Sequence, residues 1–138
     1  MSLDENGNVL NDHVEDVEQL FRGVPNQPSF IKEDGSITSA ILKDSHGGVS
    51  VDRDGGRNDS DVIAFFCKTQ KVLGKNISYS KFLKMPVSIV RQNKCDVTAV
   101  PLDNNPYHAE ITQNGSGELK RGDIKNIIKQ SSVLDNPV

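Results

Sequence analysis

The sequence predicts an α+β fold, with a small mixed or mainly antiparallel sheet of about four to five strands and three helices packed mainly on one side. Segments with apolar residues at helical spacing lie at the start, middle and end of the chain, whereas alternating segments are grouped at 48–52 and 85–112. At 138 residues, the chain has the usual length of one domain. We therefore assign residues 1–138 to a single domain, with flexible tails at 1–10 and 133–138.

Three segments are predicted to be helical. The first covers about 12–22, where apolar residues follow helical spacing until Gly23 interrupts the pattern. The second, which has the clearest pattern, begins at a capping Ser60 and ends at Gly74. The third covers about 121–132, where three isoleucines form one apolar face.

The strand predictions come from apolar residues that alternate with polar ones. Residues 48–52 follow a glycine pair and form the first predicted strand. Residues 85–89 and 95–99 both alternate, and the short polar segment between them predicts an antiparallel hairpin. Residues 107–112 form a further strand, whereas 36–43 fit a strand or a short helix equally well.

Composition and charge exclude several classes of function. The formal net charge is −3 and the isoelectric point is near 5.6, which makes nucleic acid an improbable partner because such binders need a strongly positive surface. No apolar run approaches the roughly 20 residues of a membrane span, and the N-terminus lacks the features of a secretory signal. We therefore expect a cytoplasmic protein without a membrane partner or a cofactor, in which Cys67 and Cys95 are free thiols.

The first candidate site lies in the sequence Asn-Pro-Tyr-His-Ala-Glu at 105–110. Zinc deaminases use a His-Ala-Glu segment, but they also need a downstream Cys-x-x-Cys pair that this chain lacks, so we predict no metal site. In a strand, His108 and Glu110 would share one face, while Tyr107 points to the other. The pair could exchange protons as catalytic acid and base, or it could simply be the polar face of an edge strand.

The second candidate site is the loop at 52–61, which is predicted to be exposed. Its acidic residues suggest calcium, but the spacing does not fit an EF-hand loop. Arg53 and Arg57 flank a glycine pair ahead of a helix N-terminus, a combination that could bind an anion such as phosphate. We predict Asp52, Arg53, Arg57 and Tyr107 as ligand-binding residues, and a solvated turn is the alternative.

Two blocks of the chain carry a resemblance. SFIKEDGSITSAILKDSHGGVSVDR at 29–53 and PLDNNPYHAEI at 101–111 resemble blocks found in small uncharacterised bacterial proteins. The resemblance implies a stand-alone bacterial domain and assigns no catalytic residue. It directs attention to the segments 50–53 and 105–110.

Three functional hypotheses follow. The first is a non-enzymatic accessory domain whose partner is another protein, because no complete catalytic set is present. The second is a metal-independent phosphodiesterase or ribonuclease that uses His108, Glu110 and the arginines. The third is a small-anion or nucleotide-binding module. The enzymatic hypothesis requires the 52–61 loop to lie within about 15 Å of His108, the reach of one pocket.

Overall fold

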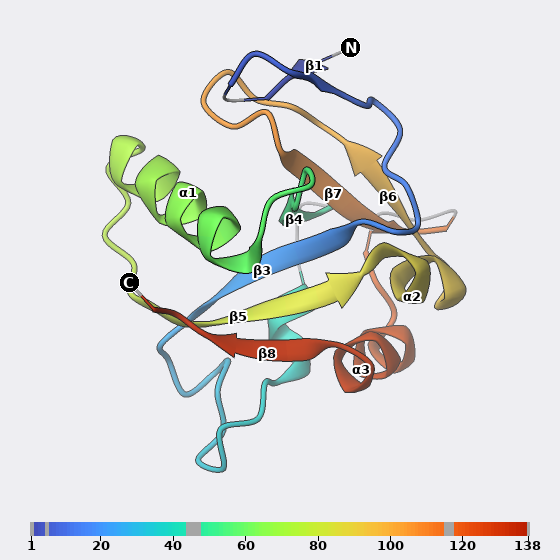
Figure 1. Ribbon diagram of the computed structural model, residues 1–138. Helices are drawn as coiled ribbons and strands as arrows, with labels where there is room; N and C mark the ends of the chain where they lie inside the picture. The colour runs from blue at the N-terminus through green and yellow to red at the C-terminus, as the bar shows by residue number, and fades with distance from the viewer. Residues whose placement is uncertain (1, 5, 44–47, 115–117, 138) are drawn as a thin grey trace.

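The computed structural model describes residues 2–4, 6–43, 48–114 and 118–137 (Figure 1). Within these ranges, six strands form one sheet in the order β6-β7-β4-β3-β5-β8, and two short strands form a separate hairpin. Every pairing is antiparallel. The strands are β1 (Ser2–Leu3), β2 (Val9–Leu10), β3 (Gln19–Pro25), β4 (Val49–Arg53), β5 (Tyr79–Pro86), β6 (Cys95–Ala99), β7 (His108–Gln113) and β8 (Ser132–Asp135). The helices are α1 (Asp59–Val72), α2 (Val87–Gln92) and α3 (Arg121–Lys129), with a 3-10 turn, η1, at Ser39–Leu42.

The predicted α+β class and antiparallel sheet are confirmed, but the sheet has more strands than the sequence predicted. The strands β4 and β7 lie where alternation placed them, as do the helices α1 and α3. The cap of α1 is Asn58 rather than Ser60, since the Asn58 side chain accepts a hydrogen bond from the backbone N–H of Asp61. The ambiguous segment at 36–43 contains η1.

The helix predicted at 12–22 is wrong, because its second half is the central strand β3. Val17 is 83% exposed, so the apolar residues do not share a buried helical face. Leu20 and Phe21 are adjacent and both buried, which occurs in a strand whose two faces are both covered. Such a strand loses the polar–apolar alternation by which strands are recognised.

The hairpin predicted at 85–99 is also wrong. Met85 lies at the end of β5, whose last residue is Pro86, and the chain then turns directly into α2, where Val87 and Val90 are buried one helical turn apart. The second predicted strand exists as β6, but its partner is β7. A six-residue helix is too short to show a helical period in the sequence.

Both segments predicted to be tails contribute short strands. Near the N-terminus, β1 pairs with β2, and Leu10 of β2 is buried. Residues 132–135 form β8, which pairs with β5 at the edge of the sheet. Tertiary pairing therefore organises both segments despite their polar sequences.

Helices cover both faces of the sheet, not mainly one. On one face, η1, α2 and α3 enclose the main apolar core, which includes Leu20 from β3 and Leu83 from β5. On the other face, α1 packs its Phe66 edge-on against Phe82, with ring centroids 5.3 Å apart. Figure 1 shows α1 and α3 on opposite sides of the strands. The two faces are covered separately because neighbouring residues of a strand, such as Phe82 and Leu83, project to opposite faces of the sheet.

The strands β3 and β4 separate shortly after they meet, and this separation positions the candidate site. They pair only at Leu20 with Arg53 and at Phe21 with Asp52. Beyond that point, the side chain of Arg22 spans the gap and donates to the carbonyl oxygen of Ser50 at 2.8 Å. The sheet therefore has an opening on the side that α1 only partly covers.

Candidate functional site

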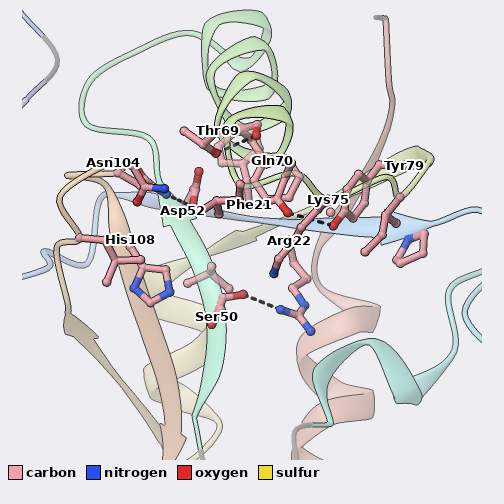
Figure 2. A pocket seen from close by; sticks show the side chains of 18 of the residues that line it. Phe21, Arg22, Ser50, Asp52, Thr69, Gln70, Lys75, Tyr79, Asn104 and His108 are labelled. Atoms are coloured by element: carbon pink, nitrogen blue, oxygen red, sulfur yellow. Dashed lines mark hydrogen bonds between the residues drawn. The ribbon is translucent and has the colours of Figure 1, made fainter.

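A cleft of about 450 Å³ lies between α1 and the sheet, at the opening between β3 and β4 (Figure 2). Its volume lies within the range of small-molecule sites. Its lining comes from both strands, the second half of α1, the segment that follows α1, and the loop at 101–107. The polar lining residues include Arg22, Ser50, Asp52, Thr69, Gln70, Asn104, Asn105 and His108.

The most unusual group in the cleft wall is the carboxylate of Asp52. The residue is 4% exposed, and its Oδ1 accepts a hydrogen bond from Asn105 Nδ2 at 2.9 Å. Its Oδ2 is buried and has no partner among the described residues. Burial raises the pKa of Asp52, because removing water penalises the charged form more than the neighbouring donor and cations favour it. A buried oxygen without a partner costs about 1–3 kcal/mol, so a ligand that donates to it would gain this energy.

His108 lies directly opposite Asp52 in the antiparallel pairing of β4 with β7. Figure 2 shows both residues, with Ser50, on the same part of the cleft. The ring atom Nδ1 is 2.8 Å from the carbonyl oxygen of Val100. Since a carbonyl oxygen only accepts, Nδ1 carries the proton and donates it to Val100. The contact also shows that Asp52 does not orient the imidazole as it would in a catalytic triad.

The mouth of the cleft is apolar. Leu73, Ile77 and Leu102 are 52%, 45% and 45% exposed, and all three line it. Leu73 and Ile77 belong to the segment that directly follows α1, and Leu102 belongs to the loop before β7. An apolar rim above a polar interior is the usual composition of a binding site for small organic molecules.

The two sequence blocks chosen as candidate sites lie side by side. Asp52 pairs with His108 and Ser50 pairs with Glu110, so the start of the 52–61 loop lies next to the predicted catalytic strand. His108 and Glu110 share a face, since both are half-buried and alternate with buried Ala109. Only Asp52 and His108 of the six predicted site residues line the cleft, and Glu110 lies outside it.

The prediction that Arg53 binds a ligand is not supported by its contacts. Its side chain is only 2% exposed and forms an ion pair with Glu18, at 2.8 and 2.9 Å. It also donates to the carbonyl oxygens of Asn11 and His13, at 2.7 and 3.4 Å. The guanidinium thus joins the chain before β3 to the end of β4, and it has no donor directed at the cleft.

Arg57 and Tyr107 also pack within the protein. The Arg57 guanidinium carbon lies 3.4 Å from the centre of the Tyr107 ring, and two of its nitrogens donate to the carbonyl oxygens of Asp54 and Arg53. Gly55 has a φ of +58°, and a side chain there would meet the Tyr107 ring at 2.6 Å. The loop predicted to be exposed therefore begins with buried residues and packs closely against Tyr107, and of its residues only Asp52 lines the cleft.

Several lining residues were not identified from the sequence. Phe21 was assigned to a helix, and Phe66 and Thr69 were taken only as parts of an amphipathic helix. Asn104 was noted only within a loop, and Asn105 was part of the 105–110 candidate block but was given no role. The one available signal was the pair of asparagines beside the His-Ala-Glu segment, because asparagine amides often supply directional contacts in binding sites.

No family model matches the chain, and no curated protein or solved structure is significantly similar to it. In the described part of the chain, no group of three or more His, Cys, Asp and Glu side chains is placed to hold a metal ion. The helices described there are all too short or too polar to cross a bilayer. The chemistry of the cleft is therefore the main source for a functional proposal.

Proposed function

We propose that this protein is a non-enzymatic accessory domain that binds a small organic molecule in the cleft between α1 and the sheet. The observation that carries the proposal is the buried, unpaired Oδ2 of Asp52 in the cleft wall. A structural carboxylate is expected to have its hydrogen bonds completed by the fold, as a buried polar group without them is destabilising. Asp52 lacks this completion beside a cavity of ligand size, which favours binding as its role.

The arrangement supports this function better than the anion-binding or phosphodiesterase hypotheses. Both of those require arginine side chains to face the ligand, but Arg53 and Arg57 are held by internal contacts. A phosphodiester in the cleft would also meet the carboxylate of Asp52, which repels its charge. His108 and Glu110 remain a possible proton-transfer pair only for a substrate that needs no arginine for charge stabilisation.

The exposed apolar residues Leu73, Ile77 and Leu102 also fit a second type of ligand, which is a side chain of a partner protein. A side chain of a partner protein could enter the cleft while its backbone contacts Leu73 and Leu102. We also propose that the domain lies in the cytoplasm, because Cys67 and Cys95 are free thiols.

A ¹H–¹⁵N NMR titration of the full chain tests the proposal. The probes are small amines, carboxylic acids, nucleotides, short RNA and divalent cations. We expect at least one class to shift amides around 50–52, 66–77 and 102–108, which contribute to the cleft. Shifts confined to other regions, or none with any probe, would contradict the proposal.

A matched pair of variants separates binding in the cleft from binding nearby. Ser50→Tyr places a large side chain in the cleft, because exposed Ser50 lines it. Thr98→Tyr places the same side chain on exposed Thr98 of β6, which pairs with Glu110 from the opposite side. Binding should be lost in Ser50→Tyr and retained in Thr98→Tyr, whereas equal binding to both would place the ligand elsewhere.

A further inference from the structure

We infer that the ligand presents a guanidinium or primary ammonium group on an apolar stem, and that Asp52 is its counter-ion. This inference rests on the proposed function and specifies the chemical class of the ligand. The same head group occurs in free amines and in the side chains of arginine and lysine. The experiment below distinguishes these sources.

The polar end of the cleft is rich in acceptors. The Asp52 Oδ2 has no partner in the described structure, and the Nδ1 donor of His108 is already used by the carbonyl oxygen of Val100. Thr69 donates its hydroxyl to the carbonyl oxygen of Phe66, which leaves the hydroxyl oxygen able to accept. A head group with several N–H donors matches this set, whereas a carboxylate or phosphate would add acceptors to acceptors.

The charges around Asp52 also favour a cation. Arg22 lines the cleft, but its Nε and Nη1 donate to the carbonyl oxygens of Ile41 and Ser50 at 3.2 and 2.8 Å, so these two donors are used by the backbone. Lys75 lies at the exposed end of the cleft, where water and salt screen its charge. Asp52 therefore supplies the buried charge of the cleft, and the protein as a whole has a net charge of −3.

The apolar parts of the cleft match the stem that carries such a head group. Phe21 and Phe66 line the interior, and Leu73, Ile77 and Leu102 line the mouth. An aliphatic stem can lie along such a surface while its charged end reaches a buried acceptor. Aromatic faces also attract ammonium and guanidinium groups.

The test is isothermal titration calorimetry of the full chain with agmatine, butylamine, N-acetyl-arginine amide, acetate and adenosine monophosphate. Binding of the cationic probes, with no heat from the two anions, is the expected result. Binding of agmatine or butylamine would identify a free amine as sufficient. Binding of N-acetyl-arginine amide alone would indicate a side chain of a partner protein.

Two variants assign the contact to Asp52. Asp52→Asn keeps the shape but removes the charge, and it should weaken cation binding roughly tenfold or more. Asp103→Asn is the matched control, because Asp103 is exposed and lies outside the cleft lining, between Leu102 and Asn104, which line it. The Asp103→Asn variant should bind the cationic probes with the same affinity as the unmodified protein. Circular dichroism of both variants confirms that they are folded.

The outcomes separate this inference from the proposed function. Cation binding that is equally strong in Asp52→Asn overturns the role of Asp52. Binding of adenosine monophosphate or acetate in the cleft, without cation binding, overturns the ligand class but leaves a binding domain. If neither these probes nor the broader NMR panel perturbs the cleft, the proposed function fails together with the inference.

Discussion

Two adjacent residues at the end of β4, Asp52 and Arg53, bury opposite charges in different ways. Arg53 is 2% exposed and its donors reach the Glu18 carboxylate and two backbone carbonyl oxygens. Asp52 is 4% exposed, but one of its two carboxylate oxygens has no partner in the described structure. The comparison teaches that neighbouring buried charges can differ in how far the fold completes their hydrogen bonds: the fold supplies partners to Arg53 and leaves one oxygen of Asp52 without one.

The largest effect on stability is expected when the buried Arg53 guanidinium loses its ion-pair partner, Glu18. Glu18→Ala leaves Arg53 buried without its carboxylate, and we expect the free energy of unfolding to fall by about 3–5 kcal/mol. Urea denaturation followed by circular dichroism measures the change. The control is Asp16→Ala, which removes an exposed carboxylate paired with Arg91 and should cost at most about 1 kcal/mol. Similar losses in both variants would remove the distinction between the two sites.

A smaller effect is expected when Asp52 loses its one partner. Asn105 donates to Asp52 and also accepts a hydrogen bond from the backbone N–H of Tyr107 at 3.0 Å. Asn105→Ala leaves both groups without this contact, so the free energy of unfolding should fall by about 1–3 kcal/mol. The double variant with Asp52→Asn measures the coupling between the side chains. Strict additivity would show that the hydrogen bond contributes no stability.

Removing the negative charge of Asp52, whose Oδ2 has no partner in the described structure, should stabilise the protein. Burial raises the pKa of Asp52 in the folded state, although His108 and Arg57 favour its charged form. The folded protein therefore binds more protons than the unfolded chain between the two pKa values, and this contribution to stability falls as pH rises from about 4. We expect Asp52→Asn to gain on the order of 1 kcal/mol at pH 7 and almost nothing near pH 4.

Urea denaturation of Asp52→Asn and the unmodified protein, at pH 4 and pH 7, measures this dependence. An Asp103→Asn control should show little difference at either pH, because its carboxylate is exposed. A loss of stability in Asp52→Asn at pH 7 would mean that the Asp52 carboxylate is satisfied within the fold. Its assignment as the ligand contact would then lose its main support.

The smallest effect is expected at an exposed ion pair on the edge strand. Lys81 and Asp135 join β5 to β8 at 2.8 Å, and the Asp135 side chain is 88% exposed. Hydrogen bonding to Lys81 lowers the pKa of Asp135. Asp135→Asn should leave the thermal unfolding midpoint unchanged, because water and salt screen such pairs. A clear decrease would show that the ion pair, rather than the strand pairing, holds β8 in place.

The sequence alone predicted the helices and strands whose own residues carry a full helical or alternating pattern of apolar side chains. The strands β4 and β7 show alternation, and α1 has a clear cap and a glycine stop. The central strand β3 was missed because both of its faces are covered, and β8 was missed because it is only four residues long and depends on pairing with β5. A local pattern cannot show coverage or pairing that residues far along the chain supply.

The sequence likewise predicted some features of the candidate site, and the tertiary structure decided the others. Asp52 and His108 were both selected from the sequence, in blocks more than fifty residues apart, and alternation placed His108 and Glu110 on one face. Tertiary structure decided that Asp52 pairs with His108 beside a cleft, while Arg53 turns to Glu18. Strand geometry fixes the side of the sheet to which each residue points. The contacts that each side chain makes there depend on the packing of the whole chain. In this packing, Asp52 Oδ2 has no partner in the described structure, whereas the Arg53 guanidinium bonds to Glu18 and to two backbone carbonyl oxygens.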